Sequence, residues 1–294
     1  MSIPHPAQEN RTRSMGVDIG ATLAKFAVRG PDGSLCFDFI SAGDLPGIDR
    51  RIGDAAPDCV GLTGCGATAA AARLDRPSRC CLEFEAWGRG SQILLRDQGL
   101  GDEAPYLLVS LGTGTSILRV EGESVSRLGG TALGGGTLVG LGAALTGCPS
   151  HGEICLLAEA GDRGKVDLRV SDIYQNDEIP LPGETTAASF GGLARWGSGA
   201  EGAAHPNPAT SARSEDLAAA VIGLVGENVA LVCGGIAQAA GIRRIVYGGA
   251  TLHENPALVA ILLGVTRLMG GEPVLLESGS FAGAVGALES AQRG

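Results

Sequence analysis

The chain has 294 residues, of which 44% are hydrophobic, 18% charged and 4% aromatic, and its formal net charge is −10. This balance excludes a disordered chain and predicts a soluble globular protein with a core built mainly from Ala, Val, Leu and Ile. The acidic charge argues against nucleic acid and against an anionic membrane surface as partners, since both favour basic faces. No apolar run approaches the length of a membrane span, so we expect a cytoplasmic protein without a membrane partner.

The first residues and the cysteines agree with this compartment. Residues 1–13 are polar and have no apolar core, which predicts a short disordered tail and no signal peptide. Eight cysteines are scattered without a C-x-x-C spacing, which argues against both a disulfide framework and a zinc site. We therefore expect reduced cysteines that act as small buried hydrophobes.

The chain opens on three short apolar runs. The runs at 15–19, 23–29 and 35–40 are separated by turn residues, which predicts an antiparallel meander. The first turn belongs to the motif Asp18-Ile-Gly-Ala-Thr-Leu-Ala-Lys25. A strand over 59–63 and an alanine-rich helix over 67–73 follow, and a longer helix is expected over about 83–96.

After a polar break at 97–105 the same order begins again. A strand over 106–111 leads into the motif Ser110-Leu-Gly-Thr-Gly-Thr-Ser116, and strands over 116–121 and 124–128 follow. Such an internal duplication predicts a two-lobed α/β protein. We expect an N-terminal lobe over 14–103 and a C-terminal lobe over 104–294.

The rest of the C-terminal lobe is predicted to be mostly helical. The expected helices cover 134–146, 153–160, 214–239, 254–269 and 280–288, with a strand over 244–247. Ser214 is expected to cap the long helix that it begins. Residues 174–212 hold most of the turn-forming residues, so we expect loops there around at most one short helix.

Each Gly-Thr motif ends a strand and can present backbone N–H groups to an anion such as a nucleotide phosphate tail. Asp18 would lie near a Mg²⁺ ion carried by the phosphates, but an Asp in a turn is also common for local reasons. Lys25 either neutralises phosphate or lies on a solvated strand face. The hydroxyls of Thr113 and Ser116 either cap turns or bind a phosphate or a substrate hydroxyl.

Three further features carry candidate chemistry. Arg127 suits bidentate capture of a carboxylate, although it can equally be a surface charge. The run Gly134-Gly-Gly-Thr137 opens a helix despite the low helix propensity of glycine, and we expect a flat ligand or a phosphate to approach it closely. Glu83 and Glu85 complement a helix dipole, and Glu83 can act as a general base if it faces the ligand.

The order of these motifs resembles the type II pantothenate kinases of the actin and sugar-kinase superfamily. The resemblance runs from Met15 to Ala287 and rests on nine segments, which are Asp18–Lys25, Glu83–Glu85 with Arg89 and Gly90, Gly112–Ile117, Arg127–Gly136, Leu145–Cys148, Asp172–Tyr174, Ala187–Gly191, Ser214–Ala218 and Gly283–Ala287. It implies an α/β, two-lobed actin/hexokinase-like (ribonuclease H-like) duplicated fold with an ATP cleft between the lobes.

The resemblance also implies a function: transfer of phosphate from ATP, with Mg²⁺, to the primary hydroxyl of pantothenate, giving 4′-phosphopantothenate in the first step of coenzyme A biosynthesis. Glu83 matches the catalytic base, Asp18 the residue near Mg²⁺ through water, and Thr115, Ser116 and Arg127 the pantothenate site. The positions that match the ATP and phosphate segments are Asp18, Ile19, Gly20, Ala21, Thr22, Leu23, Ala24, Lys25, Gly112, Thr113, Gly114, Gly134, Gly135, Gly136, Thr137 and Leu138. A homodimer in which Ala187 reaches the partner's site, and feedback inhibition by acyl-CoA, are implied as well.

Some positions depart from the family pattern. Ala21 stands where the family usually has a second glycine, which is tolerated if its φ stays negative. Residues 248–250 lack the polar residue that relatives often place there, and 174–212 is poorly matched outside 187–191. Alternatives therefore stay open: a kinase of this fold for pantetheine, another small alcohol or a sugar, a non-catalytic nucleotide- or acyl-CoA-binding sensor, or a reductive-activator ATPase whose cysteines would share an iron–sulfur cluster across a dimer.

Overall fold

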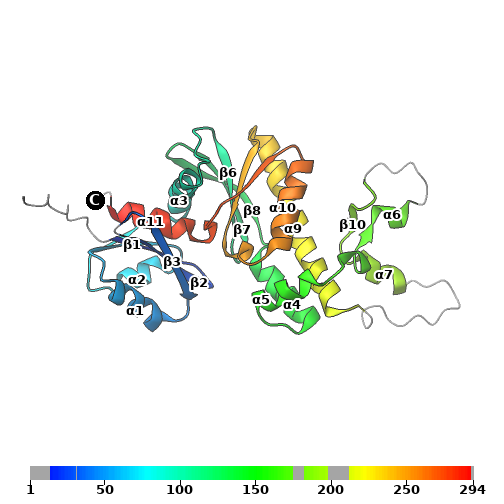
Figure 1. Cartoon of the computed structure of the whole chain (residues 1–294), viewed down its shortest axis with the longest axis horizontal. Coiled ribbons are helices and arrows are strands. Elements are labelled where there is room, and N and C mark those ends of the chain that lie inside the picture. The colour runs from blue at the N-terminus through cyan, green and yellow to red at the C-terminus, as the bar shows by residue number, and fades with distance from the viewer. Residues whose placement is uncertain (1–13, 31, 175–181, 198–211, 293–294) are drawn as a thin grey trace, which may run out of the picture. The chain divides into compact units, whose positions relative to one another are not determined.

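The computed structural model describes residues 14–30, 32–174, 182–197 and 212–292 (Figure 1). The expected tail over 1–13 and much of the loop region within 174–212 lie outside these ranges. The chain divides into two compact units. Unit 1 comprises Met1–Glu103, Val120–Ser126 and Glu277–Gly294, and unit 2 comprises Ala104–Arg119 and Arg127–Leu276. This division differs from the expected lobes of 14–103 and 104–294, because two later segments return to unit 1.

Unit 1 is built on a mixed five-stranded sheet in the order β3-β2-β1-β4-β5. Its strands are β1 (Ser14–Ile19), β2 (Leu23–Arg29), β3 (Leu35–Ser41), β4 (Cys59–Thr63) and β5 (Ser78–Cys80). The first three strands pair antiparallel, and β4 and β5 are added in parallel. Every residue of β1 is buried, as expected for a central strand. The predicted meander is confirmed.

The helices of unit 1 include one that the sequence pattern did not reveal. They are α1 (Leu45–Ala55), α2 (Ala67–Ala71), α3 (Glu83–Asp97) and α11 (Ala282–Gln292), with a 3₁₀ turn, η3 (Gly279–Phe281). The unpredicted helix α1 begins where Pro46 and Gly47 suggest a turn. Asp44 caps it, since its Oδ1 accepts a hydrogen bond of 3.0 Å from the Gly47 N–H.

Helix α11 packs against β1, β4 and α3 at very short range. A Cβ atom at Gly16 in β1 would overlap the carbonyl oxygen of Ala284, and one at Gly61 in β4 would overlap that of Ala287. Only glycine fits at either strand position, so the sequence of the first strands is matched to a helix near the end of the chain. This contact explains why Glu277–Gly294 belongs to unit 1.

Unit 2 contains a second five-stranded sheet, in the order β12-β11-β6-β7-β8. Its strands are β6 (Tyr106–Leu111), β7 (Thr115–Glu121), β8 (Ser124–Thr131), β11 (Arg244–Gly248) and β12 (Glu272–Leu275). Strand β11 pairs in parallel with both β6 and β12. Three consecutive strands followed by two parallel additions repeat the order of the first sheet. The predicted internal duplication is confirmed and extends to all five strands.

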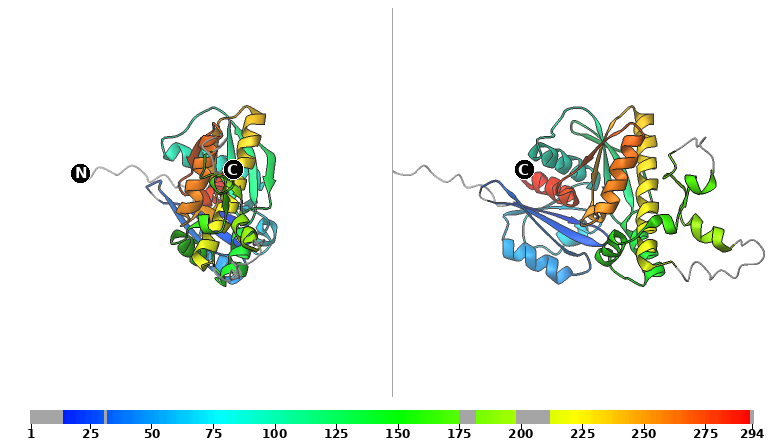
Figure 2. Two further views of the ribbon diagram at one scale, coloured as in Figure 1. Left: turned by 90° about the vertical axis from the view of Figure 1, so that its right-hand side faces the viewer. Right: turned by 45° about the vertical axis from the view of Figure 1, so that its right-hand side comes forward.

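The main helices of unit 2 agree with the sequence pattern. They are α4 (Gly135–Thr146), α5 (His151–Glu159), α9 (Ser214–Ala240) and α10 (Pro256–Leu268), and α9 and α10 lie side by side (Figure 2). The short elements are η1 (Arg163–Lys165), β9 (Leu168–Arg169), α6 (Val170–Ile173), β10 (Thr186–Ala188), α7 (Gly191–Gly197) and η2 (Ala250–Leu252). The expected cap of α9 is wrong by one residue: Arg213 holds that position, and no side chain caps the helix.

Helix α9 corrects the expectation that no apolar run approaches the length of a membrane span. It is long and apolar enough to cross a membrane by length and composition. However, 67% of its apolar stretch is buried inside the structure. Val221, Val225 and Val229 of α9 lie in the main hydrophobic core of unit 2. The helix is therefore buried to the extent expected of a core helix. A core helix can be as long and as apolar as a helix that spans a membrane.

Candidate functional site

The first Gly-Thr motif forms the tight turn between β1 and β2. The Gly20 N–H donates a hydrogen bond of 3.0 Å to the Leu23 carbonyl, so this predicted phosphate donor is used within the turn. Ala21 and Thr22 at the tip are exposed. Ala21 is not among the residues with positive φ, so the replacement of the family's glycine introduces no backbone strain.

Asp18 and Lys25 flank this turn and form a buried ion pair. They face each other across β1 and β2, with 3.3 Å between Lys25 Nζ and Asp18 Oδ2. Their side chains are only 4% and 11% exposed. The Lys25 ammonium also lies 5.6 Å from the centre of the Trp87 ring, within the range of a cation–π contact. Lys25 is therefore not on a solvated strand face.

Two glycines make room for the Asp18 carboxylate. A Cβ atom at Gly64 would lie 2.8 Å from Asp18 Oδ1, and one at Gly283 would lie 2.6 Å from Oδ2. Gly64 has a φ of +85°, which favours glycine in any case, whereas Gly283 lies in α11. Backbone from two distant parts of the chain thus approaches the buried carboxylate closely.

Glu83 begins α3 and is electrostatically linked to this pair. The pKa of its carboxyl is raised, first by partial burial and second by the negative charge of Asp18, while Lys25 opposes the rise. The side chain still retains exposed surface. A carboxylate with these properties is more basic than a free glutamate and remains accessible to a ligand, which suits a general base.

The second Gly-Thr motif forms the turn between β6 and β7, where the Gly112 N–H donates to the Gly114 carbonyl at 2.9 Å. Helix α4 begins against this turn: the N–H groups of Gly135 and Gly136 donate to the carbonyls of Gly112 and Thr113 at 2.8 and 2.9 Å. These are helix N-terminal donors that have no partner within the helix. The turn therefore uses two of the N–H groups that were expected to face phosphate.

Close backbone packing also explains the run of glycines. A Cβ atom at Gly134 would lie 2.8 Å from Gly114 Cα, and one at Gly136 would lie 3.0 Å from the Thr113 carbonyl oxygen. The expectation was a ligand that approaches these glycines closely. The structure shows that the second Gly-Thr turn itself makes this approach.

Several predicted binding side chains are used inside unit 2. Thr115 is 4% exposed, and its hydroxyl donates to the Leu133 carbonyl at 2.7 Å. The Thr137 hydroxyl donates to the Ala132 carbonyl at 3.0 Å. Leu138 is fully buried in the core. These three residues support the two glycine segments and direct no free polar group outward.

Thr251 is a contact residue that sequence reasoning missed. Its hydroxyl donates to the Gly112 carbonyl at 2.9 Å, and its own carbonyl lies 3.2 Å from His151 Nε2. The chain reaches this position through Gly249, whose φ of +118° and close contact with Leu111 require glycine. The available signal was the pair Gly248 and Gly249, at and just after the end of β11.

Ser116 and Arg127 come from neighbouring strands and meet at Gly130. A Cβ atom at Gly130 would lie 2.7 Å from Arg127 Nη2 and 3.5 Å from Ser116 Cα. Within the described ranges, neither side chain has a hydrogen-bond or ion-pair partner. Ser116 and Arg127 thus form a pair of available polar groups.

Ala187, another predicted binding residue, is exposed on the separate two-stranded sheet of β9 and β10.

The part of the chain that the structure describes can be compared with the expectations for metal-ligating residues and for the state of the cysteines. There, no three His, Cys, Asp or Glu residues group to hold a metal ion. All eight cysteines are free, but only Cys155 and Cys233 are buried, so the expected burial is right for two of them. Burial raises the pKa of Cys155 to about 11, which keeps this thiol protonated beside His151.

Comparisons with known proteins identify relatives of this chain. Residues 78–290 match a protein-family model described as Fumble. A type II pantothenate kinase of Staphylococcus aureus is 35% identical over 274 residues, covering 93% of this chain and 98% of the relative.

Two solved structures share the fold at low sequence identity. An activator of the 2-hydroxyisocaproyl-CoA dehydratase from Clostridium difficile with bound ADPNP has a TM-score of 0.61 at 16% identity, over 96% of this chain and 94% of that one. A ROK family glucokinase from Streptomyces griseus in complex with glucose and AMPPNP has a TM-score of 0.55 at 15% identity, over 96% and 100%. The predicted two-lobed actin/hexokinase-like duplicated fold is confirmed.

Proposed function

This chain belongs to the type II pantothenate kinase family, and from that premise we propose that it transfers the γ-phosphoryl group of ATP to the primary hydroxyl of pantothenate, forming 4′-phosphopantothenate for coenzyme A biosynthesis. The observation that carries the proposal is the link between Glu83 and the buried Asp18–Lys25 pair. Phosphoryl transfer mainly requires positioning and charge neutralisation, together with a group that accepts the hydroxyl proton. Lys25 and Glu83 supply these two kinds of group.

We assign the phosphate tail of ATP to the turn after Asp18 and to Lys25, and further nucleotide contacts to Gly112–Gly114 and Gly134–Thr137. Two relatives of this fold bind ATP analogues according to their descriptions, which supports a nucleotide here. In this assignment Lys25 exchanges part of its contact with Asp18 for a phosphate oxygen. The Lys25 side chain already lies beside the turn, opposite Asp18.

We assign pantothenate to Ser116 and Arg127. The guanidinium of Arg127 presents paired donors that match a carboxylate, and the Ser116 hydroxyl can bind a second polar group of the substrate. That both side chains lack partners in the described part of the chain supports this role. Glu83 then accepts the proton from the attacking hydroxyl as the new phosphate bond forms.

Magnesium fits this site only through water. Asp18 Oδ2 faces Lys25 at 3.3 Å and the carboxylate is nearly fully buried, which favours a water-bridged contact over direct coordination. Mg²⁺ usually keeps several waters and needs few protein carboxylates. When bound, it would neutralise negative charge on the phosphates.

We further propose a cytoplasmic homodimer in which Ala187 reaches the partner's substrate, and feedback inhibition by acyl-CoA. The exposure of Ala187 on β10 supports the first role. The other features rest on family membership.

The test is ADP release with ATP, Mg²⁺ and pantothenate, with the phosphorylated product identified by mass spectrometry. Pantetheine and glucose serve as parallel acceptors, and acetyl-CoA is added in a separate arm. We expect pantothenate to give the highest kcat/KM. A folded protein that binds ATP but releases no ADP with pantothenate would contradict the proposal, and turnover with another acceptor would reassign the substrate.

A further inference from the structure

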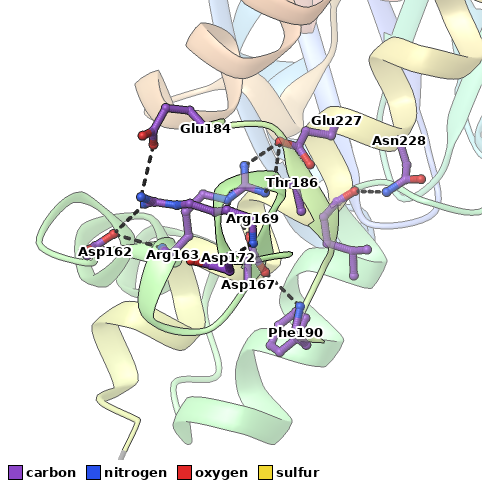
Figure 3. Close-up of polar contacts among 12 residues, drawn as sticks. Asp162, Arg163, Asp167, Arg169, Asp172, Glu184, Thr186, Phe190, Glu227 and Asn228 are labelled. Atoms are coloured by element: carbon purple, nitrogen blue, oxygen red, sulfur yellow. Dashed lines mark hydrogen bonds and ion pairs between the residues drawn. The ribbon is translucent and has the colours of Figure 1, made fainter. Parts of the chain in front are cut away.

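Arg163 connects three separate segments of unit 2 through one guanidinium group. Its Nε lies 2.7 Å from Asp167 Oδ2, its Nη1 lies 3.0 Å from Glu227 Oε1 in α9, and its Nη2 donates to the Thr186 hydroxyl at 2.8 Å (Figure 3). The Thr186 hydroxyl in turn donates to Glu227 Oε1 at 3.0 Å. We call Arg163, Asp167, Thr186 and Glu227 the Arg163 cluster.

The helix behind the cluster is shaped to receive the guanidinium. Glu227 stands in a helix that is otherwise mostly apolar, and one turn before it Gly223 lies directly against Arg163. A Cβ atom at Gly223 would overlap the guanidinium carbon. The Asp167 side chain is only 1% exposed and the Arg163 side chain 23%. Charge-assisted hydrogen bonds with this geometry are stronger and more directional than exposed ion pairs.

The cluster holds both ends of the short segment 187–189, in which Ala187 and Ala188 are exposed. At one end, the side chain of Thr186 is fixed by Arg163 and Glu227. At the other end, the Phe190 N–H donates to Asp167 Oδ1 at 2.8 Å, and Phe190 has a φ of +60°, which is unusual for a residue with a side chain. The Phe190 side chain also packs against two hydrophobic clusters of unit 2.

We propose that the Arg163 cluster positions segment 187–189 for pantothenate binding. The inference rests on the proposed function, in which Ala187 reaches the pantothenate bound by the partner subunit. The residues of the Arg163 cluster are positioning residues. Arg163 affects the substrate only through the backbone on either side of Ala187. A segment that is already held in its binding conformation loses less conformational freedom when the substrate binds, so the cluster lowers the KM for pantothenate.

Arg169 offers a matched control in the same small sheet. It faces Thr186 across β9 and β10, yet its side chain pairs with the exposed Glu184 at 3.1 Å and with Asp162 at 3.5 Å (Figure 3). Exposed pairs of this kind contribute little. Replacing Arg169 with Met also removes one guanidinium from this region, and the ion pairs that it removes, to Glu184 and Asp162, include no residue of the Arg163 cluster.

The experiment compares R163M, R163K, T186V and R169M with the wild type in the full chain. We expect R163M and T186V to raise the KM for pantothenate at least tenfold and to leave the KM for ATP within twofold. R163K should recover part of the loss, because it restores the charge but not the fork of donors. R169M should stay within twofold of the wild type for both substrates.

Amide hydrogen exchange of the peptide that contains residues 182–190 provides a readout that needs no turnover. T186V keeps the shape of the side chain, so it serves if R163M fails to fold. Without substrate, this peptide should exchange at least tenfold faster in T186V than in the wild type or in R169M. An unchanged KM for pantothenate with unchanged exchange overturns the inference, and so does an equal rise in both KM values. A wild type that does not phosphorylate pantothenate instead overturns the proposed function, independently of the exchange result.

Discussion

The two Gly-Thr turns occupy equivalent places in the duplicated sheets, but they are stabilised in different ways. The turn after β1 is flanked by the buried ion pair of Asp18 and Lys25. The turn after β6 has no charged flanking residue, and its carbonyls at Gly112 and Thr113 accept hydrogen bonds from the first residues of α4. Duplication has thus kept the place of the turn in the sheet while the chemistry diverged. One copy offers charged side chains, and the other offers tightly packed main chain.

The largest expected effect concerns Glu83, which we propose as the general base. Glu83→Gln keeps the shape of the side chain but removes the proton acceptor, so kcat should fall by about 10²–10⁴-fold. ATP binding, measured by calorimetry, should stay close to that of the wild type. Glu85→Gln in the same helical turn is the control and should retain most activity. Near-normal turnover of Glu83→Gln would assign the base to another residue.

The charged turn should also be sensitive to the loss of one partner of its ion pair. Lys25→Met leaves Asp18 buried without a cation, so the free energy of unfolding should fall by about 3 kcal/mol. The double variant with Asp18→Asn should lose less than the sum of the two single variants, as measured by denaturant unfolding. Additive losses would show that the two side chains do not stabilise each other.

The turn after β6 should instead be sensitive to added volume. In Gly134→Ala the new methyl group would lie 2.8 Å from Gly114 Cα, and the extended backbone at Gly134 creates no other obstacle. The KM for ATP should rise about tenfold, which corresponds to about 1.4 kcal/mol. Gly140→Ala in the same helix meets no atom within 4 Å and should leave the KM unchanged. Equal effects of the two variants would remove the distinction between the turns.

The smallest expected effect is a shift in pH dependence. Because the pKa of Glu83 is raised, the acid limb of the kcat profile should lie above the value of about 4.3 for a free glutamate. Asp18 raises this pKa and Lys25 lowers it, so Asp18→Asn should move the limb to lower pH and Lys25→Met to higher pH. Shifts in the same direction would exclude Glu83 as the titrating group.

Much of the fold could be predicted because its signals are local. The apolar runs and turn residues that define β1, β2 and β3 recur in β6, β7 and β8, and this repetition alone indicated two similar lobes. Helix α1 has no comparable signal, because Pro46 and Gly47 in its first turn are both poor helix formers. Proline and an Asp cap are equally typical of a helix start, and only the packed structure decides between the two.

The parts that could not be predicted depend on contacts between distant residues. The hydroxyl of Thr251 supports the carbonyl of Gly112, but no spacing in the sequence marks that contact. The roles expected for Thr115 and Gly134 followed from their place in a motif, whereas the structure uses both to hold the second turn in place. In the Arg163 cluster, only Arg163 and Asp167 are close in sequence.

The return of α11 to unit 1 has a consequence for synthesis on the ribosome. The strands that carry Gly16 and Gly61 emerge early, but the helix whose backbone contacts both glycines is translated after the whole of unit 2. Unit 2 can therefore complete its fold while unit 1 still exposes the apolar surface of β1 and β4. The core of unit 1 is completed only once α11 has been released, so this unit does not finish first although its strands emerge first.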